Sequence, residues 1–157
     1  MADNILNKIV LKKKQKLIDL KKNVSIDSLK DKIKENKNFL NFKEKINNNI
    51  LKGKFSLIAE IKKASPSAGK IFNDYNPVDL AKKLYENKAT CLSVLTEEDF
   101  FYGNLTHINK IKEKIKLPIL CKDFFIDPYQ VYLAKSYGAD AILIILASVS
   151  EEMANQL

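Results

Sequence analysis

Residues 119–146 contain the pattern that decides the fold, and they read ILCKDFFIDPYQVYLAKSYGADAILIIL. Two short apolar runs, residues 119–122 and 141–146, stand on either side of a longer amphipathic stretch. That stretch predicts a helix over residues 128–137, because it begins with proline and is followed by Gly138, a suitable C-terminal cap. Continuous apolar runs are typical of parallel strands that are covered on both faces. The segment is therefore predicted to form a strand–helix–strand unit.

The same alternation of short apolar runs and helical patterns extends outward from this segment. The predicted strands cover residues 55–61, 91–95, 119–122 and 141–146. The predicted helices cover residues 77–87, 105–115 and 128–137, and a fourth begins after Ser150 as N-cap. Four strand–helix units in a row limit the fold class to α/β, as a doubly wound sheet or part of a (β/α)8 barrel. The Gly-rich fingerprint and the P-loop are both absent, which argues against the nucleotide-binding version.

The first 54 residues differ in texture and predict a helical N-terminal extension ahead of the barrel portion, residues 55–157. They hold 15 Lys and 6 acidic residues, a net charge of +9, whereas the remainder has a net charge of −1. An apolar stripe at helical spacing runs through the extension, a new helix is expected at Ser25, and Asn47–Asn49 is expected to interrupt the last one. The uneven charge and the absence of arginine argue against a nucleic-acid partner.

Several other classes of protein are disfavoured by composition. The longest apolar run, residues 141–147, is too short to cross a bilayer, and the first residues do not resemble a secretory signal, so no membrane partner is expected. Cys91 and Cys121 both lie in strand-like runs, which predicts reduced core thiols and a cytoplasmic location. Their spacing offers no metal site.

Charged side chains stand at two predicted strand ends, where parallel α/β proteins place their active sites. Glu60 and Lys62 share one face of the first strand, and Lys122 shares a face with Phe124 at the end of the third. An ordinary buried strand would avoid these charges. The acids at residues 97–99 are expected to be solvated, whereas the aromatic run that follows them suggests a pocket wall. Such a site suits an anionic, aromatic substrate and proton transfer.

Four blocks in this order resemble the indole-3-glycerol-phosphate synthase family. The blocks are Ile58–Gly69 (IAEIKKASPSAG), Cys91–Gly103 (CLSVLTEEDFFYG), Leu117–Phe124 (LPILCKDF) and Gly138–Ile145 (GADAILII). The resemblance covers about residues 40–157, and an N-terminal helical segment is also a feature of that family. It implies a TIM (β/α)8 barrel, of which this chain holds the first four units.

The resemblance also implies an activity and a set of site residues. The activity is ring closure and decarboxylation of 1-(2-carboxyphenylamino)-1-deoxyribulose 5-phosphate to indole-3-glycerol phosphate in tryptophan biosynthesis, with no cofactor or metal. The implied catalytic residues are Lys122 as general acid, Lys62 as a contact to substrate anions, and Glu60 as the group that orients them. The implied substrate-binding residues are Ser65, Pro66, Phe101, Phe124 and Leu143.

The chain is shorter than a complete barrel, because a (β/α)8 barrel occupies about 250 residues. We expect the four units to be inactive alone and to need a C-terminal half-barrel or a second copy as partner. Two alternatives remain open at this point. One is a non-catalytic half-barrel that serves as a binding or oligomerisation module. The other is a related phosphosugar barrel such as phosphoribosylanthranilate isomerase, which the run Glu60-x-Lys62-x-x-Ser65-Pro66 disfavours.

Overall fold

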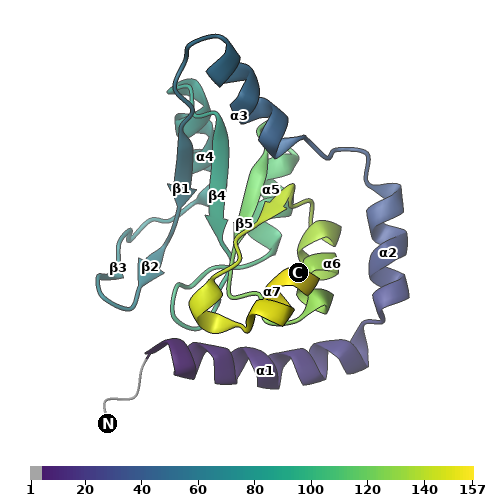
Figure 1. Ribbon diagram of the computed structural model, residues 1–157. Helices are drawn as coiled ribbons and strands as arrows, with labels where there is room; N and C mark the ends of the chain where they lie inside the picture. Colours follow the sequence, from purple (N-terminus) through teal and green to yellow (C-terminus); the bar gives the residue numbers. More distant parts are fainter. Residues whose placement is uncertain (1–4) are drawn as a thin grey trace.

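A four-stranded parallel sheet forms the centre of the computed structural model, which describes residues 5–157 (Figure 1). Its strands run in the order β1-β4-β5-β6. They comprise β1 (Ile58–Ile61), β4 (Cys91–Leu95), β5 (Ile119–Lys122) and β6 (Ala141–Ile142). Each strand pairs in parallel with the next, as the α/β prediction requires.

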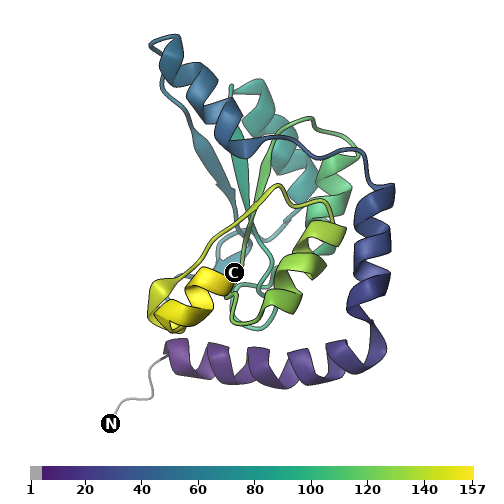
Figure 2. The same cartoon turned by 45° about the vertical axis from the view of Figure 1, so that its right-hand side comes forward.

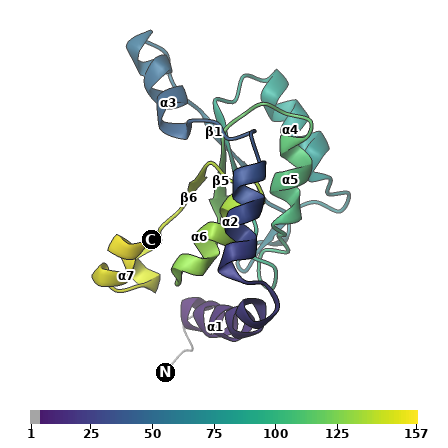
Figure 3. The same ribbon diagram turned by 90° about the vertical axis from the view of Figure 1, so that its right-hand side faces the viewer.

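Helices cover one face of this sheet and bury the core against it. They comprise α4 (Pro77–Glu86), α5 (Thr106–Lys112) and α6 (Pro128–Ser136). The core joins alternate strand residues such as Ile61, Val94 and Cys121 to Ile108 and Ile111 of α5, all wholly buried. Figure 3 shows α4 and α5 on one side of the sheet and α7 (Glu151–Gln156) on the other. On the face opposite α4–α6, Glu60 and Lys122 stay partly exposed, as residues inside a half-barrel would, although β4 is buried along its whole length.

Local sequence explains where these helices begin. The side chains of Asn76, Asp127 and Ser150 each accept a hydrogen bond from a backbone N–H of the first turn of α4, α6 and α7. Proline follows directly in α4 and α6, where its missing N–H costs nothing. The predicted N-cap at Ser150 and the predicted cap at Gly138, which has φ +97°, are both confirmed.

Three predicted elements are shorter than expected. The first strand begins at Ile58, and Phe55 is fully exposed, so the start at residue 55 was wrong. The last strand ends at Ile142 instead of 146, because within residues 5–157 no strand pairs with its outer edge. The helix expected over 105–115 is reduced to α5, although Ile115 is still buried. A hairpin of two two-residue strands, β2 (Ala64–Ser65) and β3 (Gly69–Lys70), was too short to show a period in sequence.

The predicted N-terminal helices are present as α1 (Ile5–Asn23), α2 (Ile26–Glu35) and α3 (Phe42–Leu51). Ser25 caps α2 as predicted, by accepting a hydrogen bond from the Ser28 N–H. The interruption expected at Asn47–Asn49 is wrong, because α3 continues through it. There Asn49 donates side-chain hydrogen bonds to Thr90 Oγ1 and the Phe55 carbonyl, so tertiary contacts outweigh the low helix propensity of asparagine.

Helix α1 lies across the end of the sheet where the strands finish, and α2 runs along α6 (Figures 1 and 2). Lysines of α1 form ion pairs with acidic residues that follow the strands. Lys13 Nζ lies 2.6 Å from Asp123 Oδ1, Lys16 Nζ 2.9 Å from Asp99 Oδ2, and Lys21 Nζ 2.6 Å from Asp127 Oδ2. Leu17, Leu29 and Tyr129 form a small buried cluster between α1, α2 and α6. The basic extension is thus packed on the barrel portion; the domain boundary at residue 54 stays a prediction.

Both cysteines are free and buried, as predicted. Burial raises the pKa of the Cys91 thiol to about 11 and that of the Cys121 thiol to about 12, which keeps both protonated near neutral pH. Over the described part of the chain, no helix is long and apolar enough to cross a membrane.

Asp140 joins the N-terminal extension to the sheet at the end opposite α1. Its side chain, wholly buried, accepts backbone hydrogen bonds of 2.7 Å from Leu40 N and 2.7 Å from Ile119 N. It also pairs with Lys112, whose ammonium donates a further bond to the Asn38 carbonyl. A buried carboxylate with three donors is fully compensated, so removing it leaves several groups unpaired at once.

Replacing this carboxylate is therefore expected to destabilise the whole chain. D140A should lower the free energy of unfolding by about 3 kcal/mol, because Lys112 would be left as a buried, unpaired charge. Urea unfolding followed by circular dichroism measures the loss. The matched control is D31A, which removes only an exposed pair with Lys34 and should change stability by less than about 0.5 kcal/mol. Equal stability of D140A and D31A would contradict this account of Asp140.

Candidate active site

Glu60 lies at the centre of the candidate site, between two lysines. Its Oε1 is 2.6 Å from Lys62 Nζ, and its Oε2 accepts a hydrogen bond from Lys122 Nζ. Each of the three side chains keeps about a third of its surface exposed, at 31%, 31% and 35% for Glu60, Lys62 and Lys122. The three predicted catalytic residues are therefore brought together, and all remain reachable from solvent.

The strand register explains how residues 62 positions apart in sequence meet. Glu60 on β1 pairs with Ser93 on β4, and Lys122 on β5 pairs with Leu95 of the same strand. The long side chain of Lys122 therefore reaches Glu60 from two strands away. The alternate positions Ile61 and Cys121 point into the helix-covered core, which leaves Glu60 and Lys122 on the open face.

Two opposing effects act on the pKa of Glu60. Burial alone would raise it, but the hydrogen bonds and charges of Lys122 and Lys62 outweigh burial and hold the pKa below its ordinary value. The carboxylate is therefore ionised at neutral pH. It orients the two ammonium groups on the same side of the sheet.

Two of the predicted substrate-binding residues, Phe101 and Phe124, form an aromatic pair. Phe101 follows β4 and Phe124 follows β5, and their ring centroids lie 6.2 Å apart at an interplanar angle of 41°. This tilted arrangement is one that aromatic pairs favour. Both rings are partly exposed, as a pocket wall requires. The family resemblance implied both phenylalanines as substrate-binding residues, and the structure places them side by side.

The other predicted substrate contacts are placed less closely. Ser65 belongs to the β2–β3 hairpin, where its Oγ accepts a hydrogen bond from Ala68 N, and Pro66 is exposed in the turn that follows. Leu143 follows β6 and is partly buried, and its N–H donates to the Cys121 carbonyl. No described contact joins Ser65, Pro66 or Leu143 to the Glu60 group, so their part in a site stays a prediction.

The acids after β4 correct another prediction. Residues 97–99 were expected to be solvated, but Glu97 is only 1% exposed and accepts three backbone hydrogen bonds from the loop that follows it. A buried acid next to two exposed ones has no distinct signal in a single sequence, since all three letters suit a surface loop. Glu98 and Asp99 do face outward, where both pair with Lys16.

A second buried acid, Asp123, was also missed. It accepts hydrogen bonds from Thr96 Oγ1 (2.8 Å) and Phe124 N (2.7 Å) and pairs with Lys13 of α1. Alternation along β5 could have indicated that it points away from Lys122, but its partner on α1 lies 110 residues earlier and leaves no trace in local sequence.

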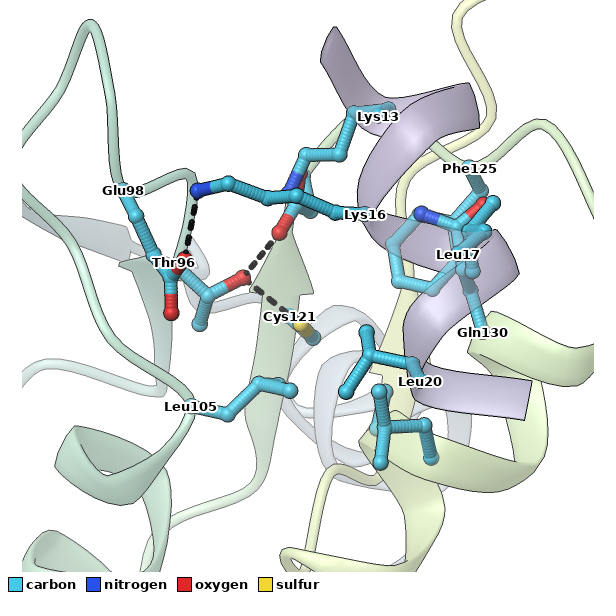
Figure 4. A pocket seen from close by; sticks show the side chains of 13 residues that line it. Lys13, Lys16, Leu17, Leu20, Thr96, Glu98, Leu105, Cys121, Phe125 and Gln130 are labelled. Atoms are coloured by element: carbon cyan, nitrogen blue, oxygen red, sulfur yellow. Dashed lines mark hydrogen bonds and ion pairs between the residues drawn. The ribbon is translucent and has the colours of Figure 1, made fainter. Parts of the chain in front are cut away.

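A partly open pocket of about 70 Å³ lies under α1 (Figure 4). It is lined by Lys13, Lys16, Thr96 and Cys121 together with apolar side chains of α1 and α6. These strand residues belong to the helix-covered face. The lining of the pocket shares no residue with the Glu60 group or the Phe101–Phe124 pair.

The open-face group can hold an anion and move protons, since it combines two ammonium groups, one carboxylate and two rings. Nothing in it favours a metal. Among residues 5–157, no group of three or more His, Cys, Asp or Glu side chains could hold a metal ion.

Comparison with known proteins relates the chain to one family. The family model described as "Indole-3-glycerol phosphate synthase" matches residues 6–157. The indole-3-glycerol phosphate synthase of Trichodesmium erythraeum is 44% identical over 149 residues, which cover 95% of this chain and 50% of that protein. That of Zymomonas mobilis subsp. pomaceae is 41% identical over 154 residues, covering 98% of this chain and 58% of that protein.

A third relative has a different name. The "Tryptophan biosynthesis protein TrpCF" of Buchnera aphidicola is 44% identical over 153 residues, which cover 96% of this chain and 32% of that protein. The chain thus spans about half the length of the synthases it matches, and a third of this longer relative. The match of the family model to nearly every residue shows that the chain belongs to the indole-3-glycerol phosphate synthase family.

Proposed function

We propose that the chain supplies half of the active site of an indole-3-glycerol phosphate synthase. The reaction would close the indole ring of 1-(2-carboxyphenylamino)-1-deoxyribulose 5-phosphate, releasing carbon dioxide and water. The observation that carries this proposal is the Glu60 carboxylate held between Lys62 and Lys122, and the Phe101–Phe124 pair adds an aromatic surface after the neighbouring strands. These groups match the substrate's own chemistry, which combines a carboxylate, an aromatic ring and a carbonyl to be protonated.

Lys122 is proposed as the general acid. Ring closure turns the substrate's carbonyl oxygen into an alkoxide unless a proton reaches it, and a fixed ammonium can both stabilise that charge and donate. The hydrogen bond to Glu60 fixes the direction of the Lys122 ammonium before substrate arrives. Preorganised donors of this kind lower a barrier because they need no reorientation during the reaction.

Lys62 is proposed to hold the substrate carboxylate until it leaves as carbon dioxide. Its ammonium pairs with the other carboxylate oxygen of Glu60 and is partly exposed, so it can exchange one carboxylate partner for another. Phe101 and Phe124 would pack on the anthranilate ring, with Leu143 deeper in the pocket, while the turn at Ser65 and Pro66 would border the substrate. No cofactor is needed for any of these steps.

A further set of strands is proposed to complete the barrel. In the described residues the outer edges of β1 and β6 have no paired strand, and Phe55, Leu57 and Ile58 beside the first edge are 101%, 55% and 44% exposed. Unpaired edges beside apolar side chains favour pairing with more strands. A C-terminal half-barrel would cover both edges, and a second copy is the alternative occupant. The two reduced thiols favour a cytoplasmic setting for the assembly.

The direct test of this function is the formation of indole-3-glycerol phosphate. The chain is combined with the C-terminal half of a 40–44% identical synthase, and the product is followed by its indole absorbance. Product is expected from the mixture and not from either half alone. Full activity of the purified 157-residue chain would contradict the half-site proposal, and inactivity of a mixture shown to have assembled would contradict the function.

Replacing Lys122 tests the general-acid role in that active assembly. K122A should lower kcat by about 10²–10⁴-fold while KM changes little, because proton donation matters mainly in the transition state. The control is K114A, a lysine on the exposed surface after α5. A large rise in KM at unchanged kcat would show that Lys122 only binds substrate.

The pKa of Glu60 tests the arrangement of the network without any activity. In the native chain it is expected to titrate below the ordinary value of 4.5, and in K122A it should rise, because the largest stabilising partner of the carboxylate is gone. A ¹³C NMR titration of the glutamate carboxyl carbons measures both values. The Glu60 pair contributes stability above pH 4.5 that is lost as the pH falls through the lowered pKa. An unchanged pKa in K122A would refute the network.

A further inference from the structure

The loop between β4 and α5 folds around one buried carboxylate. Glu97, two residues past the end of β4, is 1% exposed, although its neighbours Glu98 and Asp99 face solvent. A charged side chain is seldom buried to this degree without dedicated partners. Its partners are backbone N–H groups of the residues that follow it in the chain.

Three consecutive N–H groups donate to this carboxylate. Asp99 N lies 3.1 Å from Oε1, while Phe100 N and Phe101 N lie 2.7 Å and 3.1 Å from Oε2. Hydrogen bonds to an ionised acceptor are about twice as strong as those between neutral groups. A carboxylate has enough lone pairs for all three donors, whereas the single oxygen of an amide would have to serve three.

The same residue also closes the far end of the loop. The Glu97 carbonyl accepts a 2.7 Å hydrogen bond from Gly103 N, which reverses the chain. Tyr102 takes φ +52° to make this turn, and a Cβ at position 103 would stand 2.4 Å from the Leu95 carbonyl oxygen. Side chain and backbone of Glu97 thus fix residues 99–103 at both ends.

The residue that this arrangement aims at the site is Phe101. Its backbone N–H is bound to Glu97, and its ring lies 6.2 Å from that of Phe124. The Phe124 N–H is bound in turn to the buried Asp123. Each ring of the proposed pocket wall therefore stands on a backbone amide held by a buried acid.

We infer that Glu97 is a positioning residue, which sets Phe101 against Phe124 to receive the aromatic part of the substrate. The identity of that substrate rests on the proposed function, but the effect of Glu97 on the Phe101 ring does not. The carboxylate of Glu97 is buried and bound to backbone N–H groups, so it takes no part in proton transfer. Its effect on the reaction passes through Phe101.

The first test reads the ring itself. The chain is labelled with 4-fluorophenylalanine at its eight phenylalanines, and F101L and F124L assign two of the ¹⁹F resonances. E97Q is expected to shift or broaden the Phe101 resonance and leave that of the fully exposed Phe55 unchanged. The matched control is E98Q, one residue along, which removes an exposed carboxylate and should leave both resonances in place. An unmoved Phe101 resonance in folded E97Q would overturn the inference.

A second variant guards against loss of the fold in E97Q. E97D keeps the negative charge but has a side chain shorter by one methylene. It should therefore fold and still shift the Phe101 resonance, by less than E97Q does. Circular dichroism confirms that each variant is folded. If E97D is folded and its Phe101 resonance matches that of the native chain, the length of Glu97 does not set the ring and the inference fails.

The kinetic test separates positioning from general stability. In the active assembly, E97Q should raise KM about tenfold with kcat within about threefold, while E98Q changes neither, since the loss is one of ground-state binding. In an F101A background, E97Q should add less than about twofold to KM, because the ring through which Glu97 acts is gone. If the effects of E97Q and F101A on KM multiply in full, the route through Phe101 is refuted. Absence of synthase activity in the native assembly would refute the proposed function and leave the ¹⁹F result standing.

Discussion

The alternation of side chains along parallel strands is the constraint on which the rest of this structure depends. Along β1 and β5, alternate side chains face either the core under α4–α6 or the opposite side of the sheet, so Ile61 and Cys121 must be apolar while Glu60 and Lys122 are free to carry charge. A shift of one residue in register would exchange the two sets, burying an ion pair and exposing the core. Chemistry and packing are thus assigned by the same geometry.

The acids just beyond the strands extend this division. Asp123 and Glu97 lie where the sheet gives way to loops, and both are buried because they bind backbone N–H groups that the strands no longer pair. Lys13 of α1 adds a charge partner for Asp123. The N-terminal helices therefore do more than shield apolar surface, since they complete the electrostatics of the end of the sheet that bears the Glu60 group.

Sequence alone was sufficient for much of the fold. Proline, capping residues and apolar runs located three of the four helices after residue 54 to within one or two residues, and the strands at 91–95 and 119–122 were correct. The elements at the margins were wrong for a common reason. Residues 55–57 and 143–146 have apolar, strand-like sequences, yet a strand also needs a partner, and pairing cannot be read from one segment.

The residues of the site were likewise predicted only in part. Glu60, Lys62 and Lys122 could be proposed because charge in a buried strand is conspicuous, and Phe101 with Phe124 because aromatic side chains stand at strand exits. Glu97, Asp123 and Lys13 could not, because their letters are ordinary for loops and a helix surface. Their importance comes from burial and from partners up to 110 positions away, which only the folded chain brings together.

The distance in sequence between α1 and its partners has a consequence for how the chain is made. Lys13 and Lys21 leave the ribosome more than a hundred residues before Asp123 and Asp127, so α1 is synthesised long before the surface that holds it. Its lysine-rich helix must wait in solvent while four strands are laid down, and its high charge keeps it from aggregating in that interval. Docking of α1 is then a late step of folding.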